Sequence, residues 1–207
     1  MKHFYGLVSI LSYKVAIPLF FAISPFIANA QQQNLAYTIT RDGQNIGSMN
    51  IMETKAGDKI SYKLESEIKT KFIFNFTAKG IEEAVYSKGV LVYSSIYQKL
   101  NGKEKLNKQI KLTGNNYVIT DKEDSQQLHN VSIAYNMVCL YTNEPLHLVQ
   151  IFSDKFQKFL AIQKIAEHHY KINFPDGNFN EYIYSNGICK KIEVKHSFYN
   201  VLMELHQ

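Results

Sequence analysis

The sequence predicts an all-β protein, mainly antiparallel, built as a curled meander or an open β-barrel-like sheet with at most one or two short helices. Two observations predict this fold. Polar and apolar residues alternate with a period of two along much of the chain, which is typical of strands with one buried face. Short turn signals that contain Gly recur between these runs, as they do in sandwiches, barrels and meanders. Charged residues make up 20% of the chain, and hydrophobic residues make up 45%, so the composition is that of a folded protein.

Residues 1–30 have the features of a secretory signal peptide. Basic residues lie near the start, and residues 15–23 form an apolar stretch that is too short to span a membrane as a helix. Ala28-Asn29-Ala30 has the A-x-A form of a cleavage site. We therefore expect cleavage between Ala30 and Gln31.

Residues 31–207 are then expected to form a single β-rich domain that is exported to the periplasm or the extracellular space. Later in the chain we find no apolar run long enough for a transmembrane helix. The exported part has 21 basic and 18 acidic residues, a net charge of +3, and Arg41 is its single arginine. Such a mixed surface with little guanidinium chemistry excludes nucleic acid as the main partner.

The clearest strand pattern covers residues 59–69, where apolar side chains alternate with lysines and glutamates. Phe72, Phe74 and Phe76 continue this alternation. The strands expected from the whole chain cover residues 35–41, 46–53, 59–69, 71–78, 81–87, 90–99, 105–113, 116–121, 168–174, 179–184 and 188–205. Asn101-Gly102 and Asn186-Gly187 are the strongest hairpin signals, because both residue types tolerate positive φ.

Two segments do not follow this pattern clearly. Residues 131–141 are apolar and are expected to hold a short helix that ends before Pro145. Residues 148–166 fit either a helical stripe or two strands around a turn at Ser153-Asp154. Because the neighbouring segments are β, the two-strand interpretation is favoured.

Three short segments resemble a family of exported bacterial proteins of unknown function. They are the segment Tyr37-Thr38-Ile39-Thr40-Arg41-Asp42-Gly43-Gln44-Asn45-Ile46-Gly47 and the later blocks Phe152-Ser153-Asp154-Lys155-Phe156 and Asn186-Gly187-Ile188-Cys189. The resemblance covers most of residues 35–205. It implies an exported, mostly antiparallel β protein, with an open barrel similar to lipoprotein-carrier folds. The family has no assigned catalytic residues to transfer.

The sequence contains no motif of a known catalytic, metal or cofactor site. His168 and His169 are adjacent, so on a strand their imidazoles point to opposite faces and do not chelate one metal. Glu82 and Glu83 diverge for the same reason and are expected on a solvated face. We therefore predict no catalytic residues, no metal ligands and no cofactor.

Cys139 and Cys189 are the only cysteines. In an oxidising compartment they could form a disulfide, and the alternative is two buried free thiols. Phe72, Phe74 and Phe76 also have two interpretations. They are either plain core or the wall of an apolar cavity within a curled sheet.

The first functional hypothesis is an exported, soluble, non-enzymatic envelope protein that binds an apolar small molecule, a lipid or an envelope partner. The second is an integral outer-membrane β-barrel, whose strands alternate in the same way. The third is a secreted hydrolase without a recognisable motif. The sequence leaves the ligand, the partner proteins and the oligomeric state open.

Overall fold

The computed structural model describes residues 30–71, 75–122, 124–197 and 199–206. The described residues form one antiparallel sheet, whose spatial order is β8-β7-β6-β5-β4-β3-β2-β1-β14-β13-β12-β11-β10-β9. The strands are β1 (Gln31–Arg41), β2 (Gln44–Ala56), β3 (Lys59–Lys71), β4 (Asn75–Ser87), β5 (Val90–Leu100), β6 (Lys103–Thr113), β7 (Asn116–Asp121), β8 (Asp124–His129), β9 (Gln150–Ser153), β10 (Lys158–Ala166), β11 (His169–Asn173), β12 (Phe179–Ser185), β13 (Ile188–His196) and β14 (Tyr199–Leu205).

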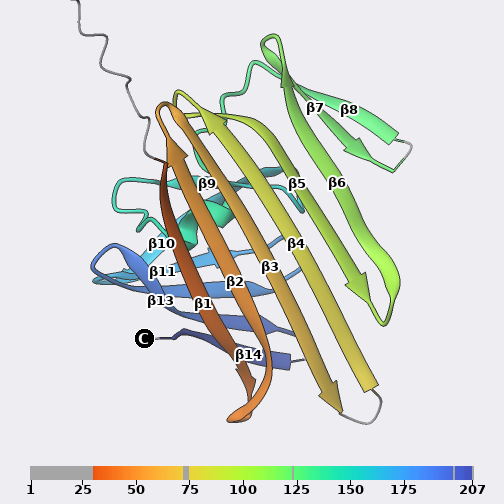
Figure 1. The fold of residues 1–207 in the computed structure, drawn as a ribbon, viewed down its shortest axis with the longest axis vertical. Helices are drawn as coiled ribbons and strands as arrows, with labels where there is room; N and C mark the ends of the chain where they lie inside the picture. The colour runs from red at the N-terminus through yellow and green to blue at the C-terminus, as the bar shows by residue number, and fades with distance from the viewer. Residues whose placement is uncertain (1–29, 72–74, 123, 198, 207) are drawn as a thin grey trace, which may run out of the picture.

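The sheet consists of two meanders that meet where the first and last strands pair. β1 to β8 follow one another in space, as do β9 to β14, and the pairing of Tyr37 with Leu205 lies at the β1–β14 junction. The strands of the second meander cross behind those of the first (Figure 1). Among the described strands, β8 and β9 are the two edges, so the sheet is curled and open. The predicted all-β, open barrel-like fold is confirmed.

The hairpin signals are confirmed by the backbone. Asn101 and Gly102 have φ values of 48° and 76°, and Asn186 and Gly187 have φ values of 53° and 76°. Positive φ at both central residues is the geometry of the type I′ turn, whose twist matches that of the flanking strands. These turns fix the register of β5 with β6 and of β12 with β13.

The ambiguous residues 148–166 form β9 and β10 around a turn, which confirms the two-strand interpretation. Three boundaries differ from the prediction. The expected strand 71–78 runs across the β3–β4 reversal, because Lys71 ends β3 and pairs with Asn75 of β4. β4 then continues through Gly80, which pairs with Ser66, into the expected strand 81–87. Residues 188–205 divide into β13 and β14 at a turn. β8 was not predicted, because all its residues except the half-buried Leu128 are polar and exposed and therefore carry no alternation.

Residues 130–149 connect β8 to β9, and we call this segment the plug. It contains a five-residue 3₁₀ helix, η1 (Met137–Tyr141), which contacts β3, β4, β9 and β13. Val138, Cys139 and Leu140 of this helix are buried. The expected short helix is therefore present and ends before Pro145. In the described part of the chain, no helix is long and apolar enough to cross a membrane.

Tyrosine hydroxyls of the sheet hold the plug. The Tyr86 hydroxyl donates a hydrogen bond to Asn136 Oδ1 and accepts one from the Asn136 backbone N–H, both at 2.8 Å. The Tyr117 hydroxyl accepts a bond from the Ile133 N–H at 3.3 Å. The Tyr184 hydroxyl donates to the Leu140 carbonyl at 2.7 Å. These bonds pair plug groups that would otherwise be buried without partners.

The Tyr86–Asn136 contact provides a test of this anchoring. Tyr86→Phe leaves the buried Asn136 N–H without its partner, so we expect the free energy of unfolding to fall by about 1–3 kcal/mol. Urea denaturation followed by circular dichroism measures it. Tyr97→Phe, on the outward face of β5, is the matched control and is expected to change stability by less than about 0.5 kcal/mol. Equal losses for both variants would contradict the anchoring role.

Candidate functional site, a cavity inside the curled sheet

A cavity of about 320 Å³ lies on the concave side of the sheet. Strands of both meanders, η1 and the β9–β10 turn contribute to its lining. Its apolar lining includes Leu64, Ile96, Met137, Phe156, Phe174 and Met203. The volume lies at the lower end of the range for small-molecule sites, which are typically apolar with a few polar groups.

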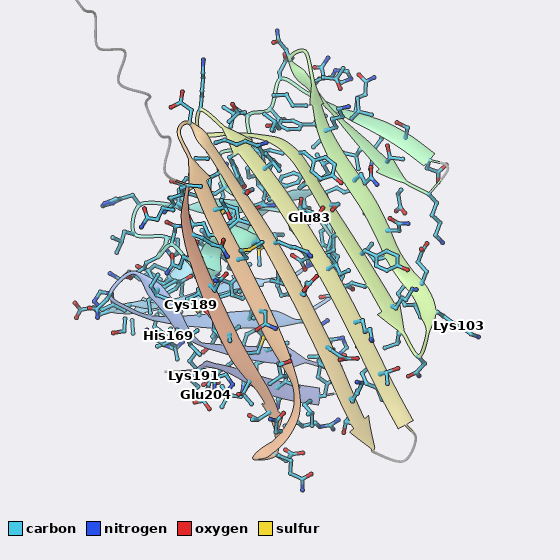
Figure 2. The ribbon with its side chains drawn as sticks, viewed as in Figure 1. Glu83, Lys103, His169, Cys189, Lys191 and Glu204 are labelled. Atoms are coloured by element: carbon cyan, nitrogen blue, oxygen red, sulfur yellow. The ribbon has the colours of Figure 1, made fainter. Side chains whose placement is uncertain are left out.

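Glu82 of β4 faces this cavity. Its register neighbours on the concave face are Leu64 of β3 and Ile96 of β5, both buried. The adjacent Glu83 points to the outer face, where its neighbours across the strands are Lys63 and Ser95 (Figure 2). The expectation that both carboxylates lie on a solvated face is therefore wrong for Glu82. The two side chains point to opposite faces of β4, as predicted, but the inner face lines the cavity.

Asp154 is the second acidic group of the cavity. It belongs to the turn between β9 and β10, and only 6% of the residue is exposed. The Ser94 hydroxyl donates to Asp154 Oδ1 at 2.5 Å, and the Asn136 Nδ2 donates to Oδ2 at 2.9 Å. The carboxylate therefore joins β5, the plug and the β9–β10 turn.

Burial raises the pKa of both carboxyl groups. The pKa of Asp154 is raised to about 6, although the hydrogen bonds from Ser94 and Asn136 favour its ionised form. Burial and the negative charge of Asp154 together raise the pKa of Glu82 to about 7. Burial, followed by nearby ionisable groups that include Glu82, raises the pKa of Tyr141 and Tyr182 above the usual range. Of the two carboxyl groups, Glu82 therefore has the pKa closer to neutral.

Residues at or beside the β9–β10, β11–β12 and β13–β14 turns line one side of the cavity, and the exposed ones mark its mouth. Exposed lining residues at this mouth include Lys155 and Asp176, whose Nζ and Oδ2 atoms lie 3.5 Å apart. The rings of Phe156 and Phe174 stack with their centroids 5.7 Å apart. The side chains of Gln126 and Gln157 form a hydrogen bond from β8 to the β9–β10 turn. This bond links the two open edges of the sheet beside the cavity.

The predicted phenylalanine wall is placed only in part. Phe72 and Phe74 lie outside the described residues. Phe76 is half-buried, pairs with Thr70 and lies on the same face of β4 as Glu82. It is absent from the described lining of the cavity. A role for these three residues stays a prediction.

The cysteines are buried and free, so the structure does not form the disulfide that the sequence allowed. The Sγ atom of Cys139 lies 3.4 Å from the Tyr86 hydroxyl. Burial raises the pKa of Cys139 to about 11 and that of Cys189 to about 12. Both thiols are therefore protonated at neutral pH and are poor nucleophiles.

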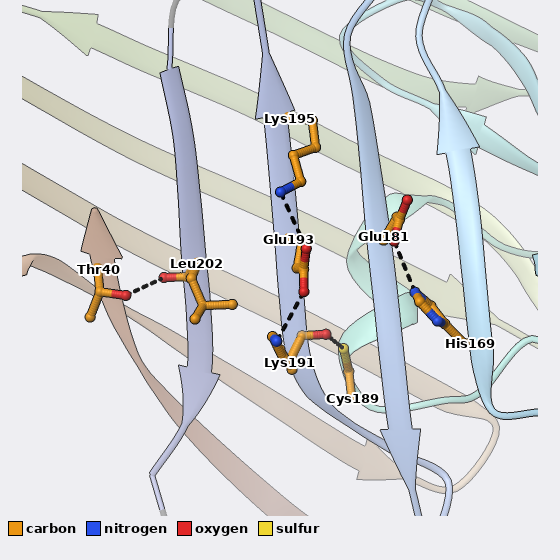
Figure 3. A network of polar contacts seen from close by, with 8 residues as sticks. All are labelled: Thr40, His169, Glu181, Cys189, Lys191, Glu193, Lys195 and Leu202. Atoms are coloured by element: carbon orange, nitrogen blue, oxygen red, sulfur yellow. Dashed lines mark hydrogen bonds and ion pairs between the residues drawn. The ribbon is translucent and has the colours of Figure 1, made fainter. Parts of the chain in front are cut away.

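The adjacent histidines contact different carboxylates, but for another reason than predicted, because His168 lies in the β10–β11 turn with a φ of 54° and only His169 is on a strand. His168 Nδ1 lies 2.9 Å from Glu144 Oε1, and His169 Nε2 lies 3.0 Å from Glu181 Oε2. Figure 3 shows the second pair, which bridges β11 and β12.

The site residues that the sequence interpretation missed are Glu82 and Asp154. Glu82 has a signal in hindsight, because it shares the phase of Ala84 and Tyr86, which are buried on the concave face. Asp154 has none, since it lies in a turn whose burial depends on the plug.

A single antiparallel sheet that curls around a lined cavity defines a β-barrel-like protein. The chain belongs to the family described as a domain of unknown function, DUF6134, which matches residues 37–206. This confirms the resemblance to an uncharacterised family. The comparison with curated proteins finds no match.

Among solved structures, the fold is similar to a β-barrel-like protein of the domain of unknown function DUF1849 from Brucella abortus. The TM-score is 0.55 at 9% sequence identity, and the match covers 85% of this chain and 95% of the other. At this identity the likeness concerns the fold alone.

The raised pKa of Glu82 predicts a pH dependence of stability. Because the folded state favours the protonated carboxyl, its contribution is fully present below the ordinary carboxyl pKa and is lost as the pH rises through about 7. From about pH 5 to about pH 8, we expect the unfolding free energy of the wild type to fall by about 2 kcal/mol relative to Glu82→Gln. Urea denaturation across this range measures the difference.

Glu83→Gln is the matched control for this measurement, because it removes a carboxylate one residue away on the outer face. It is expected to keep the pH profile of the wild type. Parallel profiles for the wild type and Glu82→Gln would show that the cavity does not perturb Glu82.

Proposed function

We propose that the protein is an exported, non-enzymatic binding protein of the cell envelope that holds an apolar ligand in its cavity. The observation that carries this proposal is the cavity of about 320 Å³, which apolar side chains line together with a smaller number of polar ones. A fully packed core leaves few voids larger than a water molecule. A lined opening of this size therefore supports a binding site.

The outer face of the sheet supports a protein surrounded by water. Glu193 forms ion pairs with Lys191 at 2.9 Å and Lys195 at 3.3 Å along β13 (Figure 3). Glu67 of β3 pairs with Lys69 and with Lys79 of β4, at 3.0 and 2.9 Å. Ion pairs of this kind are usual on a solvated surface and costly on a face that meets lipid.

The polar groups of the interior support binding rather than nucleophilic catalysis. Ser94 is fully buried, so its hydroxyl, which donates to Asp154, is not accessible to a substrate. A nucleophilic serine or cysteine needs an adjacent base or a lowered pKa. The two thiols have raised pKa values instead.

A neutral apolar dye, Nile red, tests the proposed function. We expect its fluorescence to rise on binding to the full exported protein. Val194 lines the cavity from β13, so Val194→Trp fills part of the space and is expected to weaken binding about tenfold or more. Lys195→Trp places the same ring on the outer face and is expected to bind like the wild type. Absence of wild-type uptake, or equal uptake by a folded Val194→Trp variant, would refute the binding proposal.

Export has its own test. β1 begins at Gln31, directly after the proposed cleavage site, so cleavage there would leave β1 intact, which supports the proposal. We expect protein from the envelope fraction to begin at Gln31, which N-terminal peptide analysis and intact mass establish. Envelope protein that retains residues 1–30 would contradict the signal-peptide interpretation.

A further inference from the structure

Two acidic side chains, Glu82 and Asp154, line the cavity, and neither forms an ion pair within the described part of the chain. Asp154 Oδ1 accepts a hydrogen bond from Ser94, and Oδ2 accepts one from Asn136. Within the described part of the chain, the Glu82 carboxyl accepts no hydrogen bond and forms no ion pair. Glu82 therefore faces the space between Leu64 and Ile96 without a partner of its own.

The basic groups that line the cavity lie toward its mouth. Lys155 is paired with Asp176, and the His196 ring stacks on Tyr199 with centroids 4.5 Å apart. Neither Lys155 nor His196 lowers the pKa of Glu82, which is raised by burial and by Asp154. The negative charge of Glu82 and Asp154 is thus open to compensation by a positively charged group of a ligand.

We infer that the cavity takes an apolar molecule that carries a protonated amine, with the ammonium group placed between Glu82 and Asp154. This inference rests on the proposed function and names the chemical class of the ligand. The apolar part would lie along Leu64, Ile96 and Phe156, which line the same space. Tyr141 and Tyr182 also line the cavity, and aromatic rings attract cations.

The alternatives are less favourable for electrostatic reasons. A carboxylate or phosphate ligand would approach two acidic groups in a site of low dielectric, where like charges repel strongly. A neutral alcohol would gain the same apolar contacts and would leave the ionised form of Glu82 unpaired. An apolar amine provides both interactions. Its apolar part contacts the lining, and its ammonium group donates a charge-assisted hydrogen bond to the carboxylate.

Binding of the amine also has a defined proton balance. The amine is already protonated in water near neutral pH, whereas Glu82 is partly protonated. An ammonium group beside Glu82 favours its carboxylate, so Glu82 loses its proton to the buffer as the complex forms. We therefore expect proton release of up to about one per complex, and tighter binding as the pH rises through about 7.

Titration calorimetry on the full exported protein tests the inference with three probes of equal chain length, decylamine, decanol and decanoic acid. Titrations near neutral pH in two buffers of different ionisation enthalpy report the protons released. We expect decylamine to bind at least about tenfold more tightly than decanol, and decanoic acid to bind most weakly. Decylamine alone is expected to release protons.

Because Asp154 remains, Glu82→Gln is expected to lower decylamine affinity by about tenfold and to reduce proton release, while decanol binding stays unchanged. Glu83→Gln is the matched control and is expected to leave the affinities of all three probes unchanged. Asp154 is unsuitable for this comparison, because its side chain also holds Ser94 and Asn136.

The outcomes separate the two proposals. If decanol binds as tightly as decylamine to the wild type, or if a folded Glu82→Gln variant keeps the preference, the amine inference is overturned and the apolar binding function stands. If none of the three probes binds, the proposed function fails as well. Proton release is measured on the wild type alone. If decylamine binds to the wild type and no protons are released, the inference is overturned even if Glu82→Gln does not fold.

Discussion

The hydrogen bonds between interior tyrosines and the plug are the interaction on which the rest of the structure depends. A single sheet that curls into an open barrel has a concave face larger than its own side chains can cover. The plug covers part of that face, and its backbone groups then need partners away from water. Tyr86, Tyr117 and Tyr184 meet both needs, because each ring packs in the core while its hydroxyl bonds to the plug.

The same bonds set the geometry of the cavity. Tyr86 holds Asn136, Asn136 donates to Asp154, and Asp154 also accepts from Ser94 of β5. This series fixes the β9–β10 turn, which forms part of the cavity lining. The cavity is therefore the portion of the concave face that the plug leaves uncovered, and its acidic end is adjacent to the plug.

The alternation of polar and apolar residues predicted most strands, because it indicates that one face of a strand is buried. β3 is an example, since Tyr62 and Leu64 are both buried on one face. The alternation gave no indication of β8, whose residues are exposed except for Leu128. The plug helix was expected from apolar content, but its anchors were not, because a tyrosine in a strand looks the same whether its hydroxyl meets water or Asn136. Burial of Asp154 likewise depends on contacts between segments far apart in the chain.

Glu82 shows why part of the candidate site could be predicted from the sequence. Its phase along β4 places it on the concave face with Ala84, and a carboxyl at such a position costs stability when it is ionised. An apolar residue would pack between Leu64 and Ile96 without that cost. A carboxyl group with a strongly raised pKa inside a cavity is more typical of a functional site than of a structural one. The local conflict between strand phase and charge at Glu82 is therefore the feature of the sequence that points most directly to the cavity.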